Sequence, residues 1–171
     1  MKNILSRAYK TLNLIRYSFS SGHSPQTKKI LYLSLVHSQL TYCSQIWHPH
    51  LLKDIIILEK IQHRATKYIL NNFTPDYRSH LIALKILPLM MQLELYDIMF
   101  FIRSLNVPTN AFNIYDHVTF RTGSTRSSTH LKLKNVLSRT NSARHFYFNR
   151  IPRLGNSLFT IDLDQLLGLL S

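Results

Sequence analysis

Residues 30–70 read ILYLSLVHSQLTYCSQIWHPHLLKDIIILEKIQHRATKYIL, and the spacing of their apolar residues predicts two long helices separated by a break at Pro49. The first helix should begin after Ser24, a suitable N-cap, because Pro25 fits the first helical position. It should run to about residue 46. Because its polar residues share one narrow face, it is typical of a central helix in a bundle.

The second predicted helix, residues 54–70, has two contrasting sides. At about 100° per residue, one side is apolar and consists of Leu58, Ile61, Ala65, Tyr68 and Ile69. A narrow band on nearly the opposite side holds four cations, Lys53, Lys60, Arg64 and Lys67. Periodicity alone leaves two interpretations equally open. The band is either a solvated face with i,i+4 support from Glu59, or a row of contacts to phosphate groups.

The remaining helices are predicted from the same signals. Residues 2–17 and 77–87 form two of them, and a long helix follows Pro88. Helical spacing in that helix predicts a core-facing stripe of Met91, Leu95, Ile98, Ile102 and Leu105. With only four glycines and no useful period-two alternation, strands are not expected. The predicted fold class is all-α, a helical bundle followed by a loop-rich basic tail with a short helical subdomain.

Composition divides the chain into three parts. Residues 1–105 carry the helical pattern, residues 106–130 form a Ser- and Thr-rich connection, and residues 131–171 form a basic C-terminal subdomain. A length of 171 residues suits one domain with a tail and is enough to bury a sizeable core.

Charge is strongly and unevenly positive. Twenty-one Lys and Arg against eight acids give a formal net charge of +13. Residues 1–53 contain seven bases and no acid, and residues 117–161 contain eight bases and no acid. Such patches attract polyanions, so nucleic acid is the favoured partner, with anionic membrane and acidic protein as alternatives.

Several classes of function are not supported. The single cysteine, Cys43, excludes a disulfide framework and is expected to be a small core residue. No uncharged apolar run is long enough to span a bilayer, and the first residues lack a secretion signal. The nine histidines never reach a closed metal-site spacing with Cys43. Asp162 and Asp164 are interpreted as ordinary surface acids.

Two ordered motifs lie within residues 30–70. They are LYxSLVxSxLxYCSxxWxP and DIxxLExxQxRATxxI. With them the chain resembles the region that follows the catalytic palm in the reverse transcriptases of LINE-type (non-LTR, jockey-like) retrotransposons. The matching residues are Leu31, Tyr32, Ser34, Leu35, Val36, Ser38, Leu40, Tyr42, Cys43, Ser44, Trp47, Pro49, Asp54, Ile55, Leu58, Glu59, Gln62, Arg64, Ala65 and Thr66.

The resemblance extends over most of the chain. Upstream it includes residues 8–16, and downstream it includes residues 84–89. Residues 150–158 are similar to the terminal RIPRLWNSLP motif of the family, with Gly155 in place of Trp, and Phe159 follows in place of Pro. Gln92 and Leu93 stand where many relatives carry a pair of Arg residues, which puts an ion pair or phosphate contact there in doubt.

The resemblance implies a fragment that cannot polymerise alone. In the family an Asp pair and a third carboxylate in the palm hold two Mg²⁺ ions, and no adjacent Asp pair occurs here. Residues 1–105 then correspond to a helical thumb-like domain, whose partners are the RNA/DNA template-primer duplex and the missing palm and fingers. No cofactor and no catalytic residue are expected. The expected nucleic-acid-binding residues are Lys53, Lys60, Arg64, Lys67, Arg144, Arg150 and Arg153.

Two alternatives stay open. The chain could be a helical interaction module whose basic face meets an acidic protein or an anionic membrane. It could also be the end of an active polymerase separated from its catalytic part. The sequence does not fix localisation, and for a retroelement product either the nucleus or the cytoplasm fits.

Overall fold

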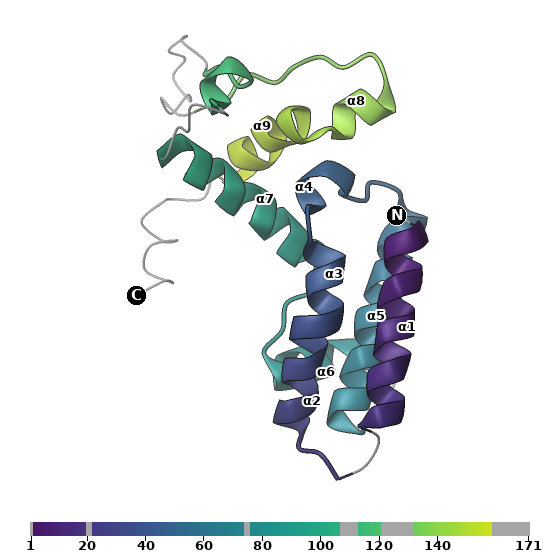
Figure 1. Ribbon diagram of the computed structural model, residues 1–171. Coiled ribbons are helices and arrows are strands. Elements are labelled where there is room, and N and C mark those ends of the chain that lie inside the picture. Colours follow the sequence, from purple (N-terminus) through teal and green to yellow (C-terminus); the bar gives the residue numbers. More distant parts are fainter. Residues whose placement is uncertain (1, 20–21, 74–75, 107–112, 121–131, 159–171) are drawn as a thin grey trace. The chain divides into compact units, whose positions relative to one another are not determined.

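The computed structural model describes residues 2–19, 22–73, 76–106, 113–120 and 132–158 (Figure 1). Within these ranges the chain is helical apart from loops and one isolated bridge between Phe120 and Leu133, so the all-α prediction is confirmed. In chain order the elements are α1 (Lys2–Ser18), α2 (Pro25–Leu31), η1 (Tyr32–His37), α3 (Ser38–Thr41), α4 (Ser44–Trp47), α5 (Leu52–Leu70), α6 (Tyr77–Leu84), α7 (Leu89–Asn106), η2 (Ile114–Asp116), α8 (Asn141–His145) and α9 (Tyr147–Leu158).

Contacts between Cα atoms group the chain into two compact units, Met1–Leu93 and Glu94–Ser171. The boundary falls inside α7, so the first residues of this helix belong to the first unit and the rest to the second. The predicted connection over residues 106–130 lies largely outside the described residues, which include only residue 106 and residues 113–120 of it.

The core of the first unit is made mainly by α1, the α2–α3 region and α5. Figure 1 shows α1 and α5 side by side. From α1, Leu5, Ala8, Leu12 and Ile15 are buried at helical spacing. The five apolar residues predicted to face inward on α5 are all buried, so that prediction is confirmed. They are Leu58, Ile61, Ala65, Tyr68 and Ile69.

The predicted central helix is interrupted. Its start is confirmed, since the Ser24 side chain accepts a hydrogen bond from the backbone N–H of Thr27 at 3.2 Å. Residues 32–37 form a π-helical segment, α3 ends at Thr41, and Cys43, with φ of +51°, lies directly before the short α4. The expectation of one helix to residue 46 was therefore wrong. Cys43 is also exposed, which corrects its prediction as a core residue.

The predicted stripe on α7 was also wrong at most of its positions. Met91, Leu95 and Ile102 are exposed, and Ile98 and Leu105 are half-buried, whereas the buried positions are Leu89, Leu93, Asp97 and Phe101. These four recur at i, i+4, i+8 and i+12, so they also lie on one side of the helix. The sequence did not indicate this buried stripe because the stripe contains the carboxylate of Asp97. A buried charge without a partner is unfavourable, so an Asp is normally expected at an exposed position.

The second unit has its own smaller core. Phe101 of α7 packs with residues from η2, from the bridged segment and from α9. The other buried members are Ile114, Val118, Leu133, Tyr147 and Ile151. Tyr147 also donates a hydrogen bond through its hydroxyl to the carbonyl oxygen of Asp97 at 3.1 Å. Ile151, which belongs to the C-terminal motif, is thus a core residue of the second unit.

Candidate nucleic-acid interface

The four cations predicted on the second long helix do share one face of α5. Lys53, Lys60 and Arg64 are exposed and Lys67 is half-buried, on the side of α5 away from its buried residues. We call Lys53, Lys60, Arg64 and Lys67 the α5 cation row. At about 1.5 Å per residue, the row is about 21 Å long. With one phosphate per about 3.4 Å of axis on each strand, that length of duplex offers each cation a phosphate.

Arg64 rests on an aromatic ring from another helix. Its guanidinium carbon lies 5.6 Å from the ring centroid of Tyr9 on α1. A stacked guanidinium loses rotamer freedom but keeps its N–H donors at the edge of its plane, where they can meet an anion. Tyr9 was missed by the sequence analysis, because no periodic pattern connects residues of different helices.

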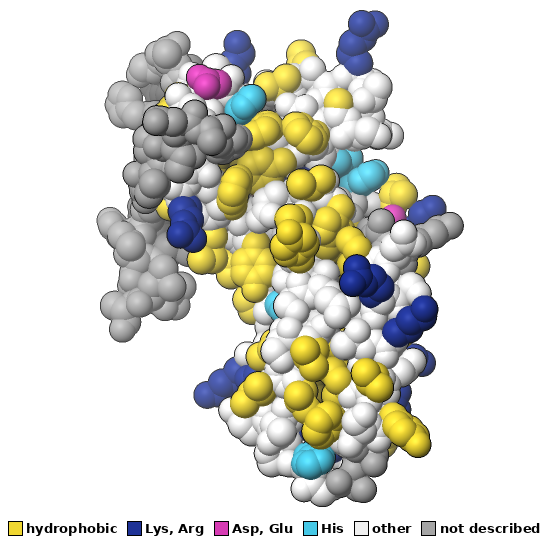
Figure 2. Space-filling model, in the orientation of Figure 1, with side chains coloured by type: hydrophobic (Ala, Val, Ile, Leu, Met, Phe, Trp, Pro, Cys, Tyr) yellow, Lys and Arg dark blue, Asp and Glu magenta, His cyan; other side chains and the backbone are white. Residues whose placement is uncertain are grey.

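A further cation lies close to the end of the same pair of helices. Burial raises the pKa of Tyr68, and the nearby charge of Arg16 on α1 acts in the opposite direction and reduces this rise. The hydroxyl of Tyr68 donates to the carbonyl oxygen of Phe19 at 2.7 Å, which ties the end of α1 to α5. Figure 2 shows Lys and Arg side chains spaced along the side of the first unit where α1 and α5 lie.

Glu59, the acid available for i,i+4 support, is used elsewhere. Its carboxylate accepts a hydrogen bond from the Tyr77 hydroxyl at 2.6 Å and another from the backbone N–H of Met90 at 2.9 Å. Burial, followed by this contact with Glu59, raises the pKa of Tyr77 far above its usual value. Within the described residues, no carboxylate lies at ion-pair distance from the α5 cation row. Its charge is therefore not neutralised by an ion pair within the described part of the chain.

The three C-terminal arginines have different surroundings. Arg144 is exposed. Arg153 is half-buried and donates to the carbonyl oxygens of Arg144 and Asn149, and its pKa is lowered by burial and then by the neighbouring Arg144 and Arg150. Of these three, only Arg144 has the exposure that a phosphate contact requires without rearrangement.

Arg150 is a correction to the predicted set. Its side chain is 9% exposed and donates from Nε and Nη2 to Oδ2 of the buried Asp97, at 3.0 and 2.7 Å. Nη1 donates to the carbonyl oxygen of His145 at 2.6 Å. A guanidinium committed in this way holds α7 to α9 and is not presented to a polyanion.

Two other kinds of site are absent from the part of the chain that the structure describes. Among the side chains that the structure describes, no three His, Cys, Asp or Glu residues are placed to hold a metal ion. None of the described helices is both long and apolar enough to cross a bilayer. Comparison with protein-family models, with curated proteins and with solved structures found no match.

Proposed function

We propose that this chain is a nucleic-acid-binding helical module that holds a duplex through its phosphates and has no catalysis of its own. The supporting observation is the α5 cation row, which projects from a packed helix and has no carboxylate partner among the described residues. A rigid row of cations suits a regular row of phosphates, because such contacts position a duplex without reading its bases.

The motif resemblance suggests the parent molecule. In reverse transcriptases of LINE-type retrotransposons, the thumb is a helical element that grips the template and primer behind the active site. We propose that this chain is such a region, and that its natural ligand is an RNA/DNA template-primer duplex. Polymerisation and its Mg²⁺ ions would belong to the palm and fingers of the parent protein.

The salt dependence of duplex binding tests this proposal directly. Each phosphate contact contributes about 0.9 to the slope of log K against log salt concentration on duplex DNA. The triple variant Lys60→Gln, Arg64→Gln, Lys67→Gln should therefore lower the slope by about 2.7. It should also weaken duplex binding at low salt, measured by fluorescence anisotropy with a labelled RNA/DNA duplex.

A matched control separates position from net charge. The variant Lys10→Gln, Arg78→Gln, Lys85→Gln removes three exposed cations from the same unit but from other elements. This control variant should leave the slope of log K against log salt concentration nearly unchanged. Equal effects of the two triple variants would contradict a specific role for α5. Tighter binding to phosphatidylserine vesicles than to the duplex would replace the proposal with the membrane alternative.

A further inference from the structure

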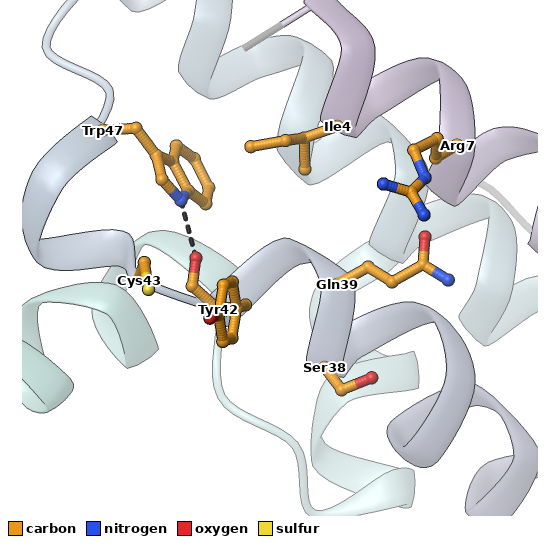
Figure 3. Close-up of a pocket in the computed structure, with 7 residues that line it drawn as sticks. All are labelled: Ile4, Arg7, Ser38, Gln39, Tyr42, Cys43 and Trp47. Atoms are coloured by element: carbon orange, nitrogen blue, oxygen red, sulfur yellow. Dashed lines mark hydrogen bonds between the residues drawn. The ribbon is translucent and has the colours of Figure 1, made fainter.

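The first unit also has a cavity whose lining includes no residue of the α5 cation row. An open cavity of about 560 Å³ lies between the start of α1 and the turn that joins α3 to α4 (Figure 3). This volume falls within the range of about 300–1,000 Å³ that is usual for small-molecule sites. Four of its lining residues, Ser38, Tyr42, Cys43 and Trp47, belong to the first sequence motif.

The break at Cys43 creates the aromatic end of the cavity. After this left-handed residue α4 runs in a new direction, and the Trp47 Nε1 group donates a hydrogen bond to the carbonyl oxygen of Tyr42 at 2.8 Å. Figure 3 shows this bond, with the indole of Trp47 on one side of the cavity and Ile4 beside it. Because the only indole N–H is already used, Trp47 contributes its ring surface to the cavity.

The other end of the cavity is polar. Figure 3 shows Arg7 of α1 and Gln39 of α3 there. Nε2 of Gln39 donates to the Thr11 hydroxyl at 3.2 Å, which fixes the orientation of the carboxamide. Its Oε1 is buried and has no hydrogen-bond partner among the described residues. A buried carbonyl oxygen without a donor is unfavourable, so a ligand N–H would be stabilised there if a shift of the surrounding side chains opened Oε1 to the cavity.

From these groups we propose that the cavity binds an unpaired nucleobase together with its phosphate. The base would stack on the Trp47 ring, one of its N–H groups would donate to Oε1 of Gln39, and Arg7 would neutralise the phosphate. The phosphate of a lipid headgroup would also engage Arg7, but a headgroup has no flat ring to stack on Trp47. The inference rests on the proposed function and extends it from duplex to single-stranded nucleic acid.

Trp47 provides the readout, because it is the only tryptophan in the chain. A base stacked on the indole quenches its emission, so titration with a short single-stranded oligoadenylate should give saturable quenching. Arg7→Gln and Gln39→Met should each weaken this binding by about tenfold. Lys10→Gln is the matched control for Arg7→Gln, since it removes an exposed cation from α1 outside the cavity and should change the affinity by less than about twofold.

The outcomes separate this inference from the proposed function. If Lys60→Gln, Arg64→Gln, Lys67→Gln loses duplex binding while oligoadenylate still quenches Trp47, both proposals are supported. Duplex binding by α5 with no change in Trp47 emission would overturn the cavity proposal alone. Equal weakening by Arg7→Gln and Lys10→Gln would overturn it too, because the oligonucleotide would then follow charge only. Circular dichroism of each variant identifies any loss of folding. Because Arg7→Gln and Gln39→Met change different residues of the cavity, each substitution tests the cavity proposal separately.

Discussion

The pKa values of His37 and His63 lie below the ordinary histidine value in the folded first unit. Burial is the main cause for both. A hydrogen bond with Gln92 acts in the opposite sense on His37, whereas the charge of Lys67 adds to the lowering for His63. The fold therefore favours the neutral form of both rings.

This preference predicts how the stability of the first unit depends on pH. Below the ordinary histidine pKa of 6.5, the unfolded chain binds more protons at these two sites than the folded chain does. The free energy of unfolding should be at its full value above about pH 6.5 and should decrease as the pH falls through the lower folded pKa values. Urea unfolding followed by Trp47 emission at about pH 7.5 and about pH 5.5 measures this.

Substitution of each histidine provides the control. His37→Gln and His63→Gln remove one titrating group each, so both should reduce the difference in stability between the two pH values. A wild-type protein that is equally stable or more stable at the lower pH would contradict the prediction.

At the scale of elements, three left-handed residues lie at helix boundaries. Cys43, Asn71 and Lys85 have φ values of +51°, +50° and +51°. Lys85 closes α6, where its N–H donates to the carbonyl oxygen of Ile82 at 3.1 Å. The N–H of Ile86 donates to the carbonyl oxygen of Leu81 at 3.0 Å. This ending explains why α6 stops at Leu84 and not near residue 87, as predicted from sequence.

A side chain with a Cβ is strained at such a position, so glycine should be an improvement there. Lys85→Gly is expected to raise the free energy of unfolding by about 1 kcal/mol. Lys85→Ala keeps the Cβ and should give no such gain. Urea unfolding followed by Trp47 emission compares the two variants. A Gly variant no more stable than the Ala variant would show that the left-handed conformation carries no strain.

The element α5 connects packing with the proposed binding surface. Its polar residues next to the core hold the connection between α6 and α7. Nε2 of Gln62 donates to the carbonyl oxygen of Leu87 at 2.7 Å, and Glu59 accepts from the N–H of Met90. Because these groups are used for structure, the opposite side of α5 can carry cations without a nearby counter-charge. This division of roles follows from the helical period.

At the scale of the whole molecule, the buried ion pair and the only tryptophan belong to different compact units. Asp97 and Arg150 join α7 to α9 within Glu94–Ser171, and Trp47 lies within Met1–Leu93. Removing one partner of a buried pair leaves the other charge uncompensated, which costs about 3–5 kcal/mol. The effect of such a change should therefore be confined to the second unit.

The variant Asp97→Asn tests this separation. Circular dichroism should show a part of the helix signal unfolding at lower urea concentration, while the Trp47 transition keeps its wild-type midpoint. Asp116→Asn is the matched control, because it makes the same change of charge at an exposed residue and should cost less than about 0.5 kcal/mol. Equal shifts of both signals in Asp97→Asn would show that the two units unfold as one.

Much of this architecture follows from local sequence pattern. The all-α class, the start of the second helix at Ser24, and the two-sided character of α5 were all predictable. Each depends on residues within one or two helical turns of one another, where the period of 3.6 residues and the capping groups decide the outcome. For the same reason, the position of Lys53, Lys60 and Arg64 on an exposed face could be predicted from the sequence.

Other features were decided only when distant segments met. Asp97 joins the buried stripe of α7 because Arg150, 53 residues away in the sequence, neutralises it, and this contact makes Arg150 a structural residue. Tyr9 supports Arg64 from another helix, and the turn at Cys43 brings Trp47 toward Ile4. The energy of a buried charge or ring depends on its three-dimensional neighbours, and the local spacing of residues along the chain does not specify them.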